Sequence, residues 1–391
     1  MRSLATILIV AVLPMLAQVP EVSEDHEAIG YRTRALSDAV AKANAELDSG
    51  KSTLRFDARS GYLGAVLRAL KVPVESQIAV FSKTSLQAQI ISPSNPRTIF
   101  FNDSVYVAWV PGEPFVEVAS VDPRQGVIFY VVDQNPYTPQ RFRRQDSCLS
   151  CHVSAASLGV PGLFARSVYP APSGYSVRTL GFFDTDHRSK FTERWGGWFV
   201  TGSLAAVPHL GNAVYTDLNG AEVRTPIEPK LDTDTYPTPY SDVVALMVFE
   251  HQLHLTDLLV RFGWQIRVAA AEGLKFDLDA AAREIVDYML FREEAPLPKP
   301  VEGSSGFAEA FAASGIRDAK GRSLKDLDLK TRLLRYRCSY MIDSPVFDAL
   351  PETGRAAIYR GLSKGLAGTE TVEVLRGTKR GLPEWFGRSG K

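Results

Sequence analysis

Two cysteines and a histidine lie within five consecutive residues near the middle of the chain. The segment Cys148, Leu149, Ser150, Cys151 and His152 has the spacing Cys-x-x-Cys-His, which is the attachment pattern of c-type haem. Each thiol can bond to one vinyl group of the porphyrin, which places the following imidazole beneath the iron. The sequence therefore predicts one covalent haem c, held by both cysteines, with His152 as the proximal iron ligand.

Two other kinds of site share the Cys-x-x-Cys spacing. A thioredoxin-like thiol pair normally lies at the start of a helix in a βαβ unit. A zinc site requires two further ligands, commonly a second pair of Cys or His, and Cys338 is the only other cysteine. Because Cys338 lies in the apolar stretch 336–342, we expect it to be a buried small hydrophobic residue.

Residues 1–18 are predicted to be a secretory signal peptide. Arg2 supplies a positive charge, residues 4–13 form an apolar run, and small residues near Ala17 offer a cleavage site. The bulk of Met15 near that site leaves an uncleaved anchor as the alternative. No later segment is predicted to span a membrane. Since c-type haem is attached after export, we expect a periplasmic or secreted bacterial protein.

The composition limits the partners that this protein can have. The 391 residues carry 44 Lys and Arg against 44 Asp and Glu, which argues against nucleic acid or an anionic membrane surface. With 45% hydrophobic residues the chain can bury one large core or two modest ones. We expect a redox partner protein or a small molecule of the cell envelope as the partner.

The pattern of apolar residues predicts an α+β fold in three regions after the signal peptide. Residues 19–140 form an N-terminal α/β region, 141–240 a loop-rich haem c-binding region, and 241–391 a mostly helical C-terminal region. Short runs rich in Val, Ile, Phe and Tyr, separated by turn residues, predict a small antiparallel sheet. These strands are expected at 77–82, 97–101, 104–110, 115–121 and 126–132.

Helices are predicted on both sides of the haem-binding region. Apolar residues recur at helical spacing in 33–47 and 61–70. A long helix capped by Ser241 or Asp242 is expected to extend to about Ala271. The other expected segments are a helix over 279–291, a linker over 296–306, and helices over 324–342 and 353–366.

The identity of the sixth iron ligand decides between functions, because a filled position is typical of electron carriers and an open one permits chemistry. His251 is one candidate distal ligand, since it lies in the apolar stripe of the long helix. Its alternative role is a hydrogen-bonded core histidine, and Met247 lies one turn away on the same face. His209, in a Pro-His-Leu-Gly-Asn loop, is the second candidate. His187 has the pattern of an exposed turn or of a polar group over an open haem face.

Two further groups of residues could contact a haem. Arg141, Arg143 and Arg144 precede the motif, and they are expected either to pair with the propionates or to form a solvated basic turn. In the segment 195–198, Trp-Gly-Gly-Trp, the glycines permit a close backbone approach and the tryptophans could pack on the porphyrin. The alternative for 195–198 is a bulged strand with two core tryptophans.

Several segments together resemble a group of exported bacterial cytochrome c-domain proteins. The similar segments are 101–134, 148–166, 185–187, 194–202, 209–212 and 250–252. The resemblance implies one covalent haem in a scaffold larger than the compact cytochrome c, and it brings no assigned activity. The group carries a Met-His pair where this chain has Leu255 and Thr256, and this departure weakens the prediction that this part of the helix ligates iron.

The sequence therefore predicts a haem c-binding exported protein that transfers electrons in the cell envelope. The alternative is a haem-dependent oxidoreductase with an open distal site and peroxidase-like or other small-oxidant chemistry. Groups such as His187, Arg194 or His209 could line that open site. No spacing of these groups is specific enough to name catalytic residues. Sensing by haem is a third class, for which the C-terminal helices are the candidate partner module.

Overall fold

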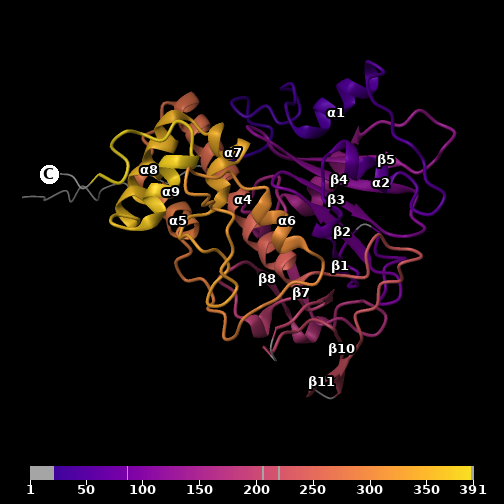
Figure 1. Cartoon of the computed structure of the whole chain (residues 1–391). Coiled ribbons are helices and arrows are strands. Elements are labelled where there is room, and N and C mark those ends of the chain that lie inside the picture. Colours follow the sequence, from indigo (N-terminus) through magenta and orange to yellow (C-terminus); the bar gives the residue numbers. More distant parts are fainter. Residues whose placement is uncertain (1–21, 86, 205–206, 219–220, 389–391) are drawn as a thin grey trace, which may run out of the picture.

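The computed structural model describes residues 22–85, 87–204, 207–218 and 221–388, so the predicted signal peptide lies outside the described residues. The α+β fold is confirmed: a sheet region precedes a largely helical C-terminal half (Figure 1). The α-helices are α1 (Ala39–Asp48), α2 (Leu63–Ala69), α3 (Leu149–His152), α4 (Val243–Glu272), α5 (Leu278–Met289), α6 (Phe307–Ala313), α7 (Pro345–Asp348), α8 (Glu352–Gly365) and α9 (Glu370–Thr378).

An antiparallel sheet of seven strands forms the N-terminal half, in the order β6-β5-β4-β3-β2-β1-β9. All five strands expected from the sequence are present, and short strands β6 and β9 extend the sheet at its two edges. The strands of this sheet are β1 (Ile78–Val80), β2 (Arg97–Phe101), β3 (Val105–Trp109), β4 (Phe115–Asp122), β5 (Gly126–Asp133), β6 (Arg143–Arg144) and β9 (Trp198–Phe199). Two small antiparallel pairs lie outside it, β7 (Ala165–Val168) with β8 (Phe182–Thr185), and β10 (Ala213–Leu218) with β11 (Ala221–Pro226).

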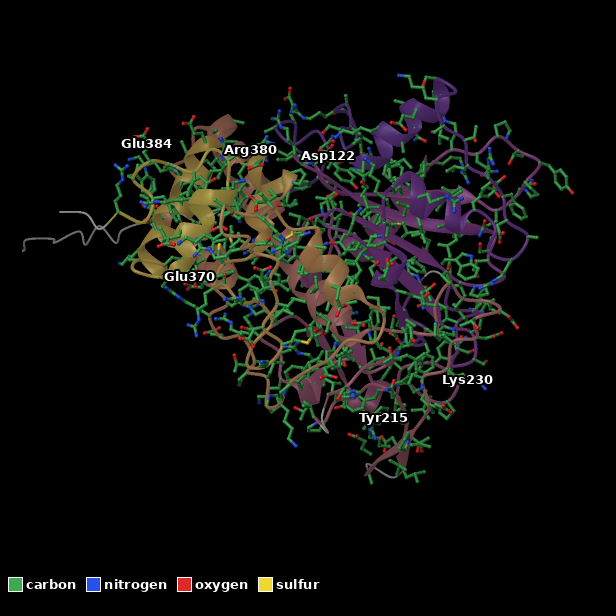
Figure 2. The ribbon with its side chains drawn as sticks, in the orientation of Figure 1. Asp122, Tyr215, Lys230, Glu370, Arg380 and Glu384 are labelled. Atoms are coloured by element: carbon green, nitrogen blue, oxygen red, sulfur yellow. The ribbon has the colours of Figure 1, made fainter. Side chains whose placement is uncertain are left out.

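The turn between β4 and β5 is held by Asp122, which Figure 2 labels. Its carboxylate accepts hydrogen bonds from the backbone nitrogens of Arg124 and Gln125 within the turn. It also accepts from the backbone nitrogen of Ser37, 2.8 Å away, just before α1. One buried carboxylate therefore fixes both the hairpin and the entry to the first helix.

The two faces of the sheet are covered by different helices. On one face, the hydroxyl of Tyr130 donates to Asp38, the residue that caps the N-terminus of α1. On the other face, Phe249 of α4 packs against the rings of Phe101 and Tyr106. The result is a layered arrangement in which α4 lies between the sheet and the C-terminal helices (Figure 1).

Helix α4 is the central element of the core. Asp242 caps it by accepting from the backbone nitrogens of Val244 and Ala245, and Gly273 ends it in the left-handed conformation with φ of 67°. Among the described residues α4 alone is long and apolar enough to cross a membrane, but nearly all of its most apolar stretch is buried inside the protein. This burial is typical of a core helix.

The helix predicted over 324–342 is wrong. Apart from a 3-10 turn at Tyr340–Asp343, this segment forms turns and bends. Asp328 shows the reason, because its side chain accepts from the backbone nitrogens of Lys330 and Thr331 and so competes with helical hydrogen bonding. The expected linker over 296–306 leads directly into α6, and α9 follows α8. Neither α6 nor α9 was predicted from the sequence.

The segment 195–198 contributes to the core. Trp195 and Trp198 are buried, and the indole nitrogen of Trp198 donates to the carbonyl oxygen of Arg166. A Cβ atom placed on Gly196 would lie 2.0 Å from the carbonyl oxygen of Val168. The glycines therefore permit contact between backbones, and the tryptophans pack in the core.

Candidate haem site

The Cys-x-x-Cys-His segment lies in a short helical turn directly after β6. Cys148 ends a 3-10 turn, and Cys151 and His152 belong to the single turn of α3. Residues three and four positions apart lie on the same side of a helix. All three reactive side chains therefore extend from one side of the turn. Both cysteines are free thiols, Cys148 partly exposed and Cys151 exposed.

The imidazole of His152 is oriented by the backbone of Gly162. Its Nδ1 atom lies 2.9 Å from the carbonyl oxygen of Gly162, so Nδ1–H donates to that oxygen. The backbone nitrogen of Gly162 in turn donates to the carbonyl oxygen of His152 at 3.0 Å. Within the described part of the chain no hydrogen bond engages Nε2 of His152. Such a bond from one nitrogen orients a metal-binding histidine and leaves the other lone pair for the metal.

Aromatic rings flank the same imidazole. The ring of Phe129 on β5 lies 4.8 Å from that of His152, and the ring of Phe164 lies 5.6 Å away. Burial among these rings lowers the pKa of His152, against the opposing effect of the hydrogen bond to Gly162. The neutral imidazole is the form that binds a metal ion. The geometry therefore fits the role of an iron ligand.

The structure offers less support for the two alternative roles of the motif, a thioredoxin-like thiol pair and a zinc site. Burial raises the pKa of Cys148 to about 11, whereas a redox-active thiol pair needs a lowered pKa. Cys338 is fully buried, and among the described residues no cluster of three or more His, Cys, Asp or Glu is arranged to hold a metal ion. A haem iron takes four ligands from the porphyrin and needs no such cluster.

An ion pair that the sequence analysis missed lies near the motif. Arg97 on β2 and Glu117 on β4 pair across the sheet, and strand register places both on the same face as Phe129. Their charges act on the pKa values of both Cys148 and His152. The Nε atom of Arg97 is buried and has no hydrogen-bond partner among the described residues. Only the alternation of residues along the strands could have suggested this pair.

The three arginines that precede the motif have separate environments. Arg141 pairs with Asp48 of α1, and Arg144 pairs with Asp146 while also donating to the carbonyl oxygen of Tyr31. Arg143 is exposed, and its pairing with Val131 places it on the same sheet face as Glu117. Of the three, Arg143 keeps the freest side chain for an anionic group.

His251 lies in the core and is engaged through both ring nitrogens. Its Nδ1 atom lies 2.7 Å from Nδ1 of His187, and its Nε2 atom lies 2.8 Å from the hydroxyl of Ser339. The ring stacks on those of Tyr288 and Phe291. Among the described residues no hydrogen bond or ring contact joins it to the haem motif. Iron ligation by His251 stays a prediction, and it would require one of these hydrogen bonds to break.

His209 occupies a partly buried position beside Trp195. Its ring lies 5.5 Å from the indole ring, and its Nδ1 atom is buried without a hydrogen-bond partner in the described chain. Burial lowers the pKa of His209 to about 4, and Arg224 acts in the same direction. The structure brings His209 into no contact with His152, so its role as a distal ligand also stays a prediction.

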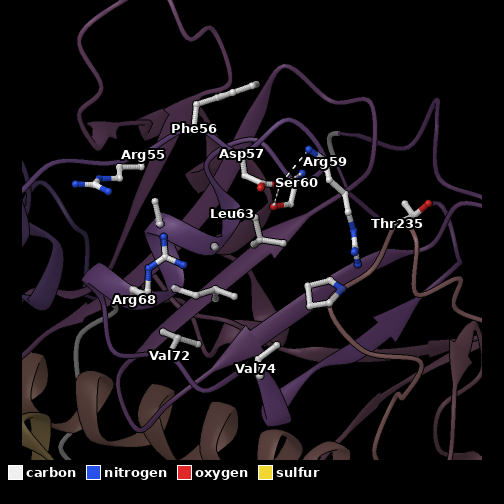
Figure 3. Close-up of a pocket in the computed structure, with 14 residues that line it drawn as sticks. Arg55, Phe56, Asp57, Arg59, Ser60, Leu63, Arg68, Val72, Val74 and Thr235 are labelled. Carbon is white, nitrogen blue, oxygen red and sulfur yellow. Dashed lines mark hydrogen bonds between the residues drawn. The ribbon is translucent and has the colours of Figure 1, made fainter.

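A cavity of about 640 Å³ lies elsewhere, along α2 (Figure 3). Arg55, Arg59 and Arg68 line it above a floor that includes the buried side chains of Leu63 and Val72. Its lining includes no cysteine or histidine. The cavity therefore offers cationic groups but none of the side chains that attach a haem or bind its iron.

Comparison with known proteins identifies no matching family model, no similar curated protein and no similar solved structure. The resemblance to exported cytochrome c-domain proteins therefore stays a prediction, and function must be argued from the site.

Proposed function

We propose that this protein binds one haem c covalently through Cys148 and Cys151, with His152 as the proximal ligand, and transfers electrons in the cell envelope. The observation that carries the proposal is the hydrogen bond from Nδ1 of His152 to the carbonyl oxygen of Gly162. This bond selects the tautomer whose free Nε2 lone pair can bind iron.

The surroundings of the motif support the same proposal. The exposed Cys151 and partly exposed Cys148 are accessible for thioether formation. The rings of Phe129 and Phe164 pack close to the imidazole and give it apolar surroundings. When bound, a haem supplies one-electron redox chemistry. The chain's own residues would attach the group, orient the imidazole of His152 and place apolar side chains around that ring, which together would influence the reduction potential.

A second candidate function is a haem enzyme with an open sixth position. It is favoured by the hydrogen bonds that occupy both nitrogens of His251, the stronger distal candidate from the sequence. If neither His251 nor His209 binds the iron, small oxidants such as peroxide could reach it. The class would then be a haem-dependent oxidoreductase.

Absorption spectroscopy of the protein expressed with haem-maturation machinery tests the proposal. We expect haem to stay with the polypeptide in acidified organic solvent, and to be extracted from the Cys148→Ser, Cys151→Ser double variant. Cys338→Ser is the matched control, because its buried thiol lies outside the motif, and it should retain covalent haem. Covalent haem that persists in the double variant but is lost from the control would contradict the proposed attachment.

Carbon monoxide separates the two candidate functions. Sharp low-spin bands that carbon monoxide does not change upon reduction would indicate a filled sixth position and an electron carrier. A high-spin ferric spectrum with ready binding of carbon monoxide to the ferrous form would indicate an open position. Peroxide and other small oxidants are then the substrates to assay.

A further inference from the structure

Asp257 is a buried acid in the middle of α4. Its side chain is 1% exposed, and its Oδ1 atom accepts one hydrogen bond, from the backbone nitrogen of Leu163 at 3.3 Å. Its Oδ2 atom is buried and has no partner among the described residues. Burial raises the pKa of Asp257 well above its usual range. Burying a polar group with incomplete hydrogen bonding costs free energy, so this position calls for a specific explanation.

The backbone that Asp257 contacts is the segment that orients His152. The carbonyl oxygen of Pro161 accepts from the backbone nitrogen of Val127 on β5 at 3.1 Å. Gly162 exchanges two hydrogen bonds with His152, one through each of its backbone polar groups. Leu163 donates to Asp257 of α4. The consecutive residues Pro161, Gly162 and Leu163 are therefore hydrogen-bonded to β5, to His152 and to α4, respectively.

The acid also packs directly against the glycine of this segment. A Cβ atom on Gly162 would lie 2.1 Å from Oδ1 and 2.5 Å from Cγ of Asp257. Any side chain at position 162 would therefore force the backbone of Gly162 or the side chain of Asp257 to shift. Contact and hydrogen bonding both link Asp257 to the carbonyl group that receives Nδ1–H of His152.

We propose that Asp257 is a positioning residue for the iron ligand: it holds the carbonyl group of Gly162 where Nδ1–H of His152 can donate to it. The inference depends on the proposed function, since it takes His152 to bind iron. Donation from Nδ1–H makes the ligating nitrogen more basic, which favours ferric over ferrous iron. Weakening this bond should therefore shift the redox equilibrium towards the ferrous form.

The midpoint potential of the haem-loaded protein tests the inference through two substitutions of Asp257. Asp257→Leu fills the space but removes the acceptor, and we expect about a tenfold shift towards the ferrous form, or ~59 mV more positive for one electron. Asp257→Asn keeps an oxygen that can accept from Leu163, and we expect less than about a twofold change. If the role of Asp257 required an ionised carboxylate, Asp257→Asn would instead shift the midpoint potential as Asp257→Leu does.

Thr256→Val is the matched control. Thr256 is adjacent and equally buried, and its hydroxyl donates to the carbonyl oxygen of Gln252 within α4 rather than to the segment 161–163. We expect it to leave the midpoint potential unchanged. A shift as large as that of Asp257→Leu would mean that any substitution in this part of α4 disturbs the site, and would overturn the assignment.

A second set of variants uses the close packing at Gly162. In the native background Gly162→Ala should shift the equilibrium towards ferrous iron, because the added methyl group collides with Asp257. In the Asp257→Ala background the methyl group has room, so the double variant should resemble Asp257→Ala alone. Additive shifts would contradict contact between these residues as the cause. This comparison also decides the question if circular dichroism shows that Asp257→Leu does not fold.

The outcomes distinguish this inference from the proposed function. If the native protein carries no covalent haem, or if His152→Ala leaves the spectrum unchanged, the proposed function is wrong. If haem is attached and His152 binds iron, but Asp257→Leu has the native midpoint potential, only the positioning role of Asp257 is wrong.

Discussion

The Nδ1 atoms of His187 and His251 lie 2.7 Å apart in the core, between the rings of Tyr288 and Phe291. At this distance one neutral imidazole donates to the other, and two protonated rings cannot share the contact. Ser339 continues the chain, because its hydroxyl lies 2.8 Å from Nε2 of His251. We therefore expect this buried pair to make the stability of the fold dependent on pH.

His251 should make the protein sensitive to acid. Burial lowers its pKa from 6.5 to about 3, so the unfolded chain binds a proton that the folded protein excludes. Its contribution to stability is therefore present above about pH 6.5 and is lost as the pH falls towards 3. Urea unfolding from pH 4.5 to 7.5 should give a shallower pH dependence for His251→Gln than for the native protein. Parallel curves would show that His251 is not the titrating group.

Glu250 should act in the opposite direction. Burial raises its pKa from 4.5 to about 7, although Arg194, 3.1 Å away, favours the ionised form. The folded state then binds the proton more tightly, so the stability that Glu250 contributes is present below about pH 4.5 and is lost as the pH rises through 7. Glu250→Gln should lower the free energy of unfolding by less at pH 8 than at pH 5. The same urea titrations test this, and an equal cost at both pH values contradicts it.

Replacing His152 by Ala should leave the thioether bonds and remove the axial nitrogen. We expect covalent haem to persist while the low-spin bands weaken in both oxidation states, as measured by absorption spectroscopy. His209→Ala and His251→Ala provide the comparison for the opposite axial position. An unchanged low-spin spectrum in His152→Ala would exclude it as the ligand.

The three thiols should differ sharply in reactivity. In the native haem-free protein we expect a chromogenic disulfide reagent to modify the exposed Cys151 first. Cys148 should react more slowly, because burial raises its pKa to about 11. Cys338 is fully buried, and its pKa is raised by burial, so it should react only after unfolding. With haem attached, Cys338 should be the one thiol left to titrate in denaturant; three reactive thiols there would rule out thioether bonds.

Gly196→Ala should be strongly destabilising. The new methyl group would lie 2.0 Å from the carbonyl oxygen of Val168, a backbone atom that cannot rotate away. We expect a loss of at least about 2 kcal/mol in the free energy of unfolding. Gly64→Ala in α2 is the control, since its nearest contact is the flexible end of Arg68 at 3.4 Å. A helical site of this kind should gain roughly 0.5–1 kcal/mol, so similar effects of both substitutions would contradict the argument.

Much of the fold could be predicted because its signals are local. The strands β1 to β5 follow from short β-branched and aromatic runs between turn residues, and Asp242 marks the start of α4. The failure over 324–342 has a local cause as well: side chains such as Asp328 compete for backbone hydrogen bonds that apolar spacing alone would assign to a helix.

The sequence by itself determined the candidate attachment motif, because Cys148, Cys151 and His152 are neighbours in the chain and their spacing alone places them on one turn. Only the tertiary structure decided what surrounds them. Asp257 and Leu163 are 94 residues apart in the chain, and their contact exists because α4 packs beside the segment after the motif. The packing of α4 against the segments that carry His187 and Ser339 likewise engages both nitrogens of His251, the favoured distal candidate, in the core. Contacts of this kind depend on how whole elements pack, which residue spacing in one chain does not specify.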